Sequence, residues 1–166
     1  ELISSLGVDN SLRRGDIARI TLEEAKELYW NGQAVITCKG RRGGKRRLLV
    51  LHRVTREPLR EYLAVRSKLV ERYGTDPGRL FLSEYHGALR NMTADTISNR
   101  TKKVGEVAGI DLASHDLRAT FGNRHWRRGT DIAIIAKMMG HETPNQTFRA
   151  YIGVDADDMR KAQDSL

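Results

Sequence analysis

The feature that most limits how this chain can fold is a glycine-rich break between two strand-like runs. Residues 33–39 and 46–52 either alternate in polarity or run apolar, and the sequence Gly-Arg-Arg-Gly-Gly at residues 40–44 lies between them. Two such runs around a glycine-rich connection are typical of a β-hairpin. The chain is therefore expected to contain an antiparallel pair of strands, and the rest of the fold must pack beside it.

Most of the remaining chain has apolar residues at helical spacing. We expect helices over residues 2–6, 12–20, 58–74, 93–107, 114 to about 128, 131–140 and 143 to about 152, with a last one opening at residue 155. Ser114 and Asp131 are suited to cap helix starts, and Gly140 to end a helix. Whether a third short strand forms near residues 20–22 is left open by the sequence. Because 166 residues suit one domain, we predict a single α+β domain, mainly helical, with a small antiparallel β-sheet packed beside a helical core.

The charge balance favours a polyanionic partner. Lys and Arg number 29 against 21 Asp and Glu, which gives a net charge of +8 and an isoelectric point near 9.9. Composition alone fits many basic proteins. Six basic residues, however, gather at the hairpin with no acid among them: Lys39, Arg41, Arg42, Lys45, Arg46 and Arg47. Such a cluster is typical of a surface that meets nucleic-acid phosphates.

Several other classes of protein are disfavoured by what the sequence lacks. The single cysteine, Cys38, excludes an internal disulfide and any cysteine-based zinc cluster, and its simplest interpretation is strand core. No apolar run reaches the length of a membrane span, and no basic-then-apolar leader opens the chain. We therefore expect a soluble cytoplasmic protein with no membrane partner, acting at the nucleoid or encoded by a virus or plasmid.

Residues suited to phosphodiester chemistry recur in a fixed order along the chain. They are Arg13 in Ser-Leu-Arg-Arg-Gly-Asp, Lys39 in the hairpin, His115 and Arg118 in Ser-His-Asp-Leu-Arg, His141 after Met-Gly, and Tyr151 in Arg-Ala-Tyr-Ile-Gly. With these motifs in this order, the chain resembles the catalytic domain of the tyrosine recombinases, the phage-integrase family of site-specific DNA recombinases. The resemblance covers nearly the whole chain.

The resemblance implies that Arg13 and Arg118 bind the scissile phosphate. Negative charge grows on the non-bridging oxygens during cleavage, and a guanidinium meets it with two parallel hydrogen bonds while staying charged. Arg14 is the alternative to Arg13, but the family's arginine directly follows the leucine. Ser11 stands where the family often has glycine, a departure without a chemical role. Asp16 is interpreted as structural, orienting Arg13 or capping backbone groups.

The same resemblance assigns roles to two histidines and a tyrosine. His115 lies three residues before Arg118, so both share one helix face, and its ring can exchange a proton near neutral pH. His141 is assigned a hydrogen bond to a non-bridging oxygen. Tyr151 is the nucleophile by position, and it needs nearby cations and a base because a free phenol titrates near pH ~10. The gap from His141 to Tyr151 is one residue longer than the family's usual gap.

The leaving 5′ oxygen needs a proton, and the resemblance places Lys39 to supply it, with Lys45 as the alternative. The other hairpin cations are expected to contact DNA phosphates: Arg41, Arg42, Lys45, Arg46 and Arg47. We expect no metal and no cofactor, because the acids form no Asp-x-Asp or Glu cluster and the histidines form no His-x-x-x-His pair. The two arginines and the lysine are expected to take the electrostatic role of a metal.

The predicted function is a site-specific DNA recombinase or integrase. Tyr151 would cleave a phosphodiester to a 3′-phosphotyrosyl intermediate, and a 5′ hydroxyl would religate it without metal or ATP. The resemblance implies double-stranded DNA as partner and a tetramer on that DNA. Two alternatives remain open: a type IB topoisomerase-like domain with the same chemistry, and a DNA-binding module that no longer cleaves. Because the chain begins without Met and as if within a helix, we expect residues 1–166 to be a catalytic domain truncated at its amino terminus, without the core-binding domain.

Overall fold

The computed structural model describes residues 1–38, 44–141, 143–151, 159–160 and 163–164, with the backbone alone for residues 148–151. The chain forms two compact units, Glu1–Phe121 and Gly122–Leu166. The boundary between them falls within helix α6 (Ser114–Arg127). Among the described residues, no helix has both the length and the apolar character needed to cross a membrane.

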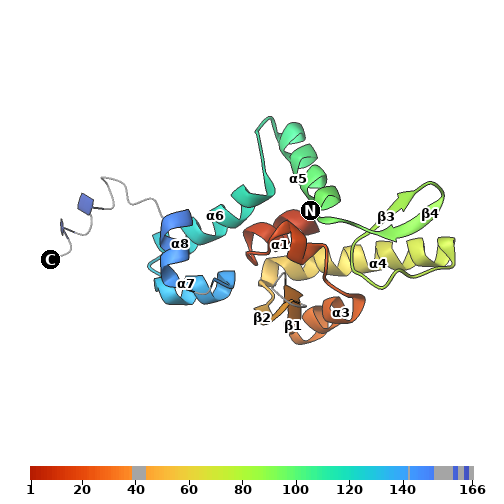
Figure 1. Cartoon of the computed structure of the whole chain (residues 1–166), viewed down its shortest axis with the longest axis horizontal. Helices are drawn as coiled ribbons and strands as arrows, with labels where there is room; N and C mark the ends of the chain where they lie inside the picture. The colour runs from red at the N-terminus through yellow and green to blue at the C-terminus, as the bar shows by residue number, and fades with distance from the viewer. Residues whose placement is uncertain (39–43, 142, 152–158, 161–162, 165–166) are drawn as a thin grey trace. The chain divides into compact units, whose positions relative to one another are not determined.

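The first unit is built from helices and two hairpins (Figure 1). In chain order its elements are α1 (Leu2–Val8), α2 (Arg14–Ile17), α3 (Leu22–Asn31), β1 (Gln33–Cys38), β2 (Lys45–Val50), the 3-10 turn η1 (Arg53–Thr55), α4 (Arg56–Tyr73), β3 (Leu82–Tyr85), β4 (Ala88–Asn91), α5 (Ala94–Ala108) and the first part of α6. β1 pairs with β2 and β3 with β4, both antiparallel. The prediction of a mainly helical α+β fold with a small antiparallel sheet is confirmed.

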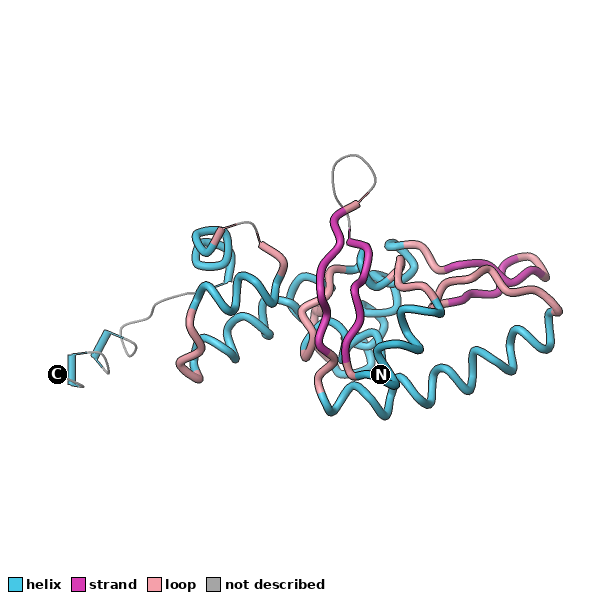
Figure 2. The backbone as a smooth tube through the Cα atoms, turned by 90° about the horizontal axis from the view of Figure 1, so that it is seen from below, coloured by secondary structure: helices cyan, strands magenta, loops and turns pink. Residues whose placement is uncertain are grey.

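The first hairpin, β1–β2, is the one that the glycine-rich break predicts. Cys38 pairs with Lys45, and the connecting residues 39–43 lie outside those described. Along β1 every second side chain is buried, so Ala34, Ile36 and Cys38 point inward. Figure 2 shows the two strands side by side along their length. One face of the hairpin therefore belongs to the core, and the other is exposed.

A helix and a hairpin of the first unit are missed by the sequence patterns above. α3 begins with a capping box, in which Thr21 Oγ1 accepts from Glu24 N (3.1 Å) and the Glu24 carboxylate accepts from Thr21 N (2.8 Å). β3 and β4 are joined by a two-residue turn, His86 and Gly87, with φ of 47° and 74°, as such a tight hairpin turn requires. This second hairpin runs beside the long helix α4 (Figure 2).

Two expected elements differ in extent from the structure. The helix expected over residues 12–20 is only the four-residue α2, and Arg13 precedes it as the N-cap residue with an extended backbone. The third short strand that the sequence left open near residues 20–22 is a single antiparallel bridge between Thr21 and Arg79. Arg13 thus projects from the entrance of a short turn rather than from the side of a helix.

Two helix starts also differ in detail. α4 begins at Arg56, so Pro58 lies within the first turn, where its missing N–H removes no helical hydrogen bond. α6 begins at Ser114, whose hydroxyl donates to Thr101 Oγ1 (3.3 Å), and it is the Asp116 carboxylate that accepts from the backbone N–H before the helix (2.7 Å). The Asp116 carboxylate thus satisfies an N–H group just before α6, and the cap expected from Ser114 stays a prediction. The helix expected from residue 155 opens outside the described residues.

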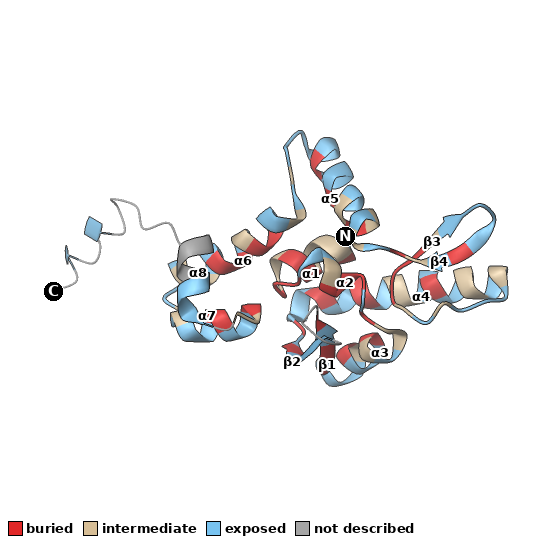
Figure 3. Ribbon diagram, in the orientation of Figure 1, coloured by how far each residue is buried: buried red, intermediate tan, exposed pale blue. Residues whose placement is uncertain are grey.

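The core of the first unit draws aliphatic side chains from both helices and strands. Its largest fully buried members include Leu6, Leu12, Ile20, Leu28, Ile36, Leu59, Leu80, Phe81 and Ile97. Figure 3 shows buried positions on α1, α2, α3, α4 and β1. Gly7 allows a close approach, because a Cβ there would lie 2.8 Å from the Cβ of Leu117. α1 therefore comes close to α6 at Leu117, near the start of that helix.

The second unit contains the end of α6, α7 (Ile132–Met139) and α8 (Pro144–Tyr151). Asp131 caps α7 by accepting hydrogen bonds from two N–H groups of its first turn, and Gly140 ends it with φ 66° in the left-handed region. Both predicted caps are confirmed. Ile135 and Met139 are fully buried, as the helical spacing predicts.

Candidate functional site

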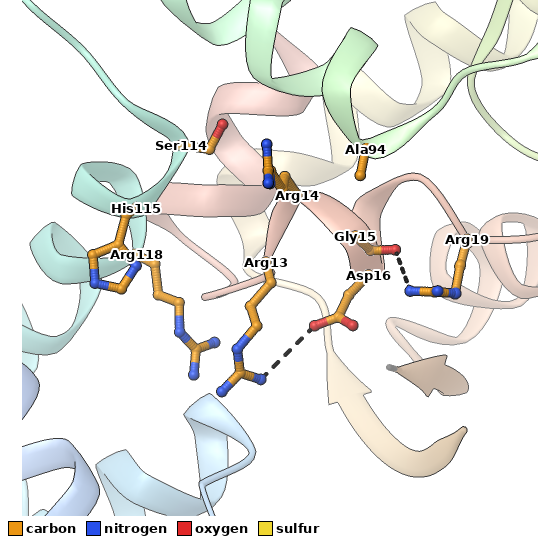
Figure 4. Close-up of a pocket in the computed structure, with 9 residues that line it drawn as sticks. All are labelled: Arg13, Arg14, Gly15, Asp16, Arg19, Ala94, Ser114, His115 and Arg118. Carbon is orange, nitrogen blue, oxygen red and sulfur yellow. Dashed lines mark hydrogen bonds and ion pairs between the residues drawn. The ribbon is translucent and has the colours of Figure 1, made fainter. Parts of the chain in front are cut away.

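Arginine side chains gather at a pocket of the first unit. The pocket has a volume of about 380 Å³ and lies between α2, the first residue of α5 and the start of α6. Figure 4 shows the guanidinium groups of Arg13 and Arg118 extending to the same side, with His115 next to Arg118. Three of the predicted site residues, from two distant segments of the sequence, therefore line one pocket.

Arg118 is held in place by Ser11. Its side chain is almost fully buried, and Nη1 donates to the carbonyl oxygen of Ser11 and to the Ser11 hydroxyl, the latter at 3.1 Å. Ser11 itself is fully buried, and its φ of 58° lies in the left-handed region that favours glycine. That conformation costs roughly 1–2 kcal/mol for a residue with a Cβ. A buried hydrogen bond to a charged group contributes about 1.5–3 kcal/mol, so the serine is tolerated because it binds the arginine.

Arg13 is more exposed and more loosely held than Arg118. Its side chain is 47% exposed, and its Nη1 lies 4.0 Å from Oδ2 of the buried Asp16. The neighbouring Arg14 points away from this group in Figure 4 and forms an ion pair with Asp95 at 3.1 Å. Of the two adjacent arginines, Arg13 is therefore the one that extends beside Arg118, which favours Arg13 over Arg14 as the second anion ligand.

His115 occupies the first turn of α6 and is exposed to solvent. The spacing of three residues puts it on the same helix face as Arg118. The start of this 14-residue helix lines the pocket through Ser114 and His115, and helix amino termini attract anions through their N–H groups and the helix dipole. Two guanidinium groups, an imidazole and a helix start thus surround one pocket. Such a site can bind a phosphate and stabilise negative charge that grows on its oxygens.

In the second unit, local contacts orient His141. It directly follows Gly140, and its ring Nδ1 lies 2.7 Å from the hydroxyl oxygen of the fully buried Thr147 in α8. The imidazole is therefore anchored through Nδ1. Tyr151 is the last residue of α8, and its side chain lies outside the described part of the chain.

The six basic residues of the hairpin are the predicted proton donor and the five predicted DNA contacts, and they fall into three groups. Three lie outside the described residues, including the predicted proton donor: Lys39, Arg41 and Arg42. Lys45 and Arg46 are exposed at the start of β2, as expected for side chains that meet DNA. Arg47 differs, because it is half-buried and its guanidinium nitrogens are shielded from solvent.

Cys38 lies on the core face of the hairpin, as its strand position predicts. Burial, assisted by the nearby Asp16 carboxylate, raises the pKa of the Cys38 thiol to about 11. The thiol is therefore protonated at neutral pH and is a poor nucleophile. Among the described residues, no group of three or more His, Cys, Asp or Glu side chains could hold a metal ion.

Sequence reasoning missed two side chains that hold the site together. It gave Ser11 no role, although a serine where the family often has glycine, close to a predicted phosphate-binding arginine, could have signalled a compensating hydrogen bond. It also passed over Thr147, a polar residue six positions after His141. Neither contact follows from spacing alone, because each depends on where the backbone places a hydroxyl group.

Comparisons with known proteins show which sequences this chain is similar to. The sequence model described as "Phage integrase family" matches residues 2–157. The chain is 27% identical to tyrosine recombinase XerA of Saccharolobus solfataricus over 160 residues, which cover 96% of this chain and 47% of that protein. It is 26% identical to tyrosine recombinase XerA of Pyrococcus furiosus over 161 residues, which cover 97% of this chain and 52% of that protein. The chain thus spans about half the length of these curated relatives.

Two solved structures share the fold. A crystal structure of XerA recombinase superposes with a TM-score of 0.78 at 23% identity, covering 99% of this chain and 56% of the other. XerH site-specific recombinase, in a post-cleavage complex with a palindromic difH substrate, gives a TM-score of 0.73 at 20% identity, covering 98% of this chain and 44% of the other. At these identities the likeness establishes the fold alone.

Proposed function

The chain belongs to the phage integrase family of tyrosine recombinases, and from that premise we propose that it breaks and rejoins DNA strands as the catalytic part of a site-specific recombinase. The observation that carries the proposal is the pocket in which Arg13, His115 and Arg118 meet at the start of α6. The curated relatives are named tyrosine recombinases, and the similar XerH structure is described as bound to a difH substrate. The proposed partner is therefore double-stranded DNA.

The proposed reaction is a transesterification in which the number of phosphoester bonds does not change. The phenolic oxygen of Tyr151 attacks a backbone phosphorus, its proton passes to His115, and a 3′-phosphotyrosyl bond forms as the bond to the 5′ oxygen breaks. The departing 5′ oxygen takes its proton from Lys39, with Lys45 as the alternative donor. Because the phosphotyrosine keeps the bond energy, a 5′ hydroxyl from another duplex reseals the strand without ATP.

The two arginines have different parts in this scheme. Arg118 is already fixed by Ser11, so it presents a guanidinium whose position costs little reorganisation when the phosphate arrives. Arg13 is half-exposed and only loosely paired, so it can turn onto the second non-bridging oxygen. Together they neutralise the charge of the pentacoordinate transition state, which is the role that a metal ion takes in other nucleases.

His141 is proposed to donate a hydrogen bond to the same phosphate. The Thr147 hydroxyl can donate to Nδ1, and in the neutral ring this leaves the proton on Nε2. Nε2–H would then face the non-bridging oxygen. This assignment makes Thr147 the residue that selects the useful tautomer of His141.

Recombination between two duplexes is proposed to require four protomers, with the hairpin cations holding the DNA backbone in each. Lys45 and Arg46 are exposed and suited to that contact. We further propose that residues 1–166 act as the catalytic part of a longer protein, because the curated relatives are about twice as long.

The proposal is tested by trapping the covalent intermediate. The full chain is incubated with a nicked half-site DNA, and protein–DNA species resistant to denaturant are counted. We expect the adduct from the wild type and from Tyr85→Phe, an exposed control tyrosine in β3, and none from Tyr151→Phe. An adduct that survives Tyr151→Phe disproves the assignment, and DNA binding without any adduct would indicate a binding module.

The same assay separates the metal-free mechanism from a two-metal nuclease. Adduct formation should persist in excess chelator, because the arginines are proposed to carry the charge. Loss of the adduct on chelation, restored by a divalent ion, would contradict it. Relaxation of supercoiled plasmid without dependence on a site would instead indicate a topoisomerase-like activity.

A further inference from the structure

Arg47 occupies an unusual position for a basic residue of the hairpin. In the register of β1 and β2 it pairs with the buried Ile36, and the next inward position of its own strand is the buried Leu49. Its neighbours Arg46 and Leu48 are exposed, because successive side chains of a strand point to opposite faces. Arg46 and Arg47 therefore adjoin in sequence but point to opposite sides of the sheet.

The guanidinium of Arg47 is shielded from solvent. Nε, Nη1 and Nη2 are all buried, and none of them has a hydrogen-bond partner among the described residues. Burial lowers the pKa of this group, as expected for a cation taken out of water. A buried cation is strongly unfavourable unless an opposite charge compensates it. The stability of this arrangement must therefore depend on an anion nearby.

Asp16 is the carboxylate that can compensate Arg47. At neutral pH the charged groups that act on Arg47 are Asp16, which attracts it, and Arg13, which repels it, and the neutral Cys38 thiol donates a hydrogen bond to Asp16. Asp16 is almost fully buried, and its Oδ2 lies 4.0 Å from Nη1 of Arg13. That separation exceeds the 2.7–2.9 Å or so of a charge-assisted hydrogen bond. One buried carboxylate thus attracts two guanidinium groups, and it lies beyond hydrogen-bond distance of the pocket arginine.

We propose that Arg47 is a positioning residue that competes with Arg13 for Asp16 and so keeps the Arg13 guanidinium available for phosphate. Arg47 itself does not touch DNA, because its nitrogens are inaccessible. Without it, the Asp16 carboxylate closes onto Arg13 and neutralises part of the charge that the phosphate needs. The inference rests on the proposed function of Arg13, and it gives Arg47 a different role from its exposed neighbour Arg46.

The first test measures folding stability and does not depend on cleavage. Asp16→Asn in the full chain should lower the urea midpoint of unfolding, because it leaves two cations without a carboxylate. Adding Arg47→Met should restore about half of that loss or more, since the buried cation is gone. Adding Arg46→Met, the matched control, should restore none. Equal recovery from both second substitutions, or recovery from neither, would overturn the coupling.

The second test measures the rate of covalent adduct formation at saturating half-site DNA. Arg47→Met should slow the wild type about tenfold and should have no further effect in an Arg13→Lys background, since it acts through Arg13. Arg47→Lys should recover part of the rate. The slope of log affinity against log salt should fall by about one unit for Arg46→Met and stay constant for Arg47→Met.

These readouts separate the two hypotheses. A lower salt slope with an unchanged cleavage rate for Arg47→Met would make Arg47 a phosphate contact and overturn the inference. If the wild type forms no adduct, the proposed recombinase function fails. The urea midpoints still decide whether Arg47 and Asp16 are coupled.

Discussion

The two units hold their functional side chains in different ways. In the first unit, Arg118 is fixed by Ser11, a residue 107 positions away in the sequence, and α1 must pack against α6 for the two to meet. In the second unit, His141 is fixed by Thr147, only six positions away, and by the helix end at Gly140. The contact in the first unit joins distant segments of the sequence, whereas the contact in the second unit joins neighbouring ones.

This difference predicts how each unit responds to substitution. A contact between distant segments is part of the core, so its loss lowers the free energy of unfolding and the rate of catalysis together. A local contact orients one ring and contributes less to the fold. Substitutions in the first unit should therefore show coupled losses, whereas those in the second should mainly affect catalysis.

The largest effect is expected for Arg118→Ala. The loss of a preorganised charge donor should slow adduct formation by about 100-fold to 1,000-fold, and it leaves the Ser11 acceptors buried without their partner, at a cost of about 1–3 kcal/mol in unfolding free energy. Single-turnover cleavage and urea unfolding measure the two losses. Arg127→Ala, on the exposed end of the same helix, serves as the control. If Arg118→Ala slowed cleavage without loss of stability, the claim that this long-range contact supports both the fold and catalysis would be wrong.

Two substitutions of Ser11 separate the contribution of its hydroxyl hydrogen bond from the cost of its left-handed backbone conformation. Ser11→Ala keeps the left-handed strain and loses the hydroxyl, so unfolding free energy should fall by about 1–2 kcal/mol. Ser11→Gly loses the hydroxyl but relieves the strain, so its loss should be smaller by about 1 kcal/mol. Both variants should cleave more slowly by about tenfold, because each removes one of the two Ser11 hydrogen bonds that hold the Arg118 guanidinium. Wild-type cleavage by the glycine variant would show that the hydroxyl does not position Arg118.

In the second unit, Thr147→Val removes the partner of His141 Nδ1 with little change in volume. The cleavage rate should fall about tenfold, as expected for the loss of one orienting hydrogen bond. Unfolding free energy should change by less than it does for Ser11→Ala. Thr147→Ser, which keeps the hydroxyl, should retain the wild-type rate. A valine variant that loses more stability than Ser11→Ala would invert the proposed contrast between the two units.

The smallest effect concerns Cys38 and the pH dependence of stability. Its pKa is raised from 9.0 to about 11 in the folded chain, so the folded state keeps the proton longer than the unfolded state does. The stabilisation is fully present below pH 9 and is lost as the pH rises towards 11. Cys38→Ala should therefore flatten the decline in unfolding free energy over this range. If the unfolding free energy declined equally in both proteins, the pKa of the thiol would be the same in the folded and unfolded chains.

Most of the secondary structure can be predicted from local signals in the sequence. The helix and the hairpin that the patterns above missed also carry such signals. The glycine-rich break predicts β1–β2, and Asp131 and Gly140 predict both ends of α7, because turns and caps are set by neighbouring residues. α3 and the β3–β4 turn also carry local signals, namely the Thr21–Glu24 capping box and Gly87. Local patterns of this kind carry much of the secondary structure.

The site is less predictable than the fold. Motif order identifies Arg13, His115 and Arg118, but it does not reveal that Ser11 binds Arg118 or that Arg47 points inward. These contacts depend on strand register and on which helix packs against which. A one-residue shift in register would turn Arg47 out to solvent and Arg46 into the core.

The central claim is that a tyrosine of the second unit becomes covalently linked to the DNA, while the arginines of the first unit bind the phosphate without a metal. The most direct measurement is to form the adduct in excess chelator, digest it with protease, and sequence the DNA-linked peptide by mass spectrometry. The account predicts one linked residue, Tyr151, joined to a 3′ phosphate. A link to any other residue, a 5′ phosphate linkage, or an adduct that forms only with a divalent ion would contradict it.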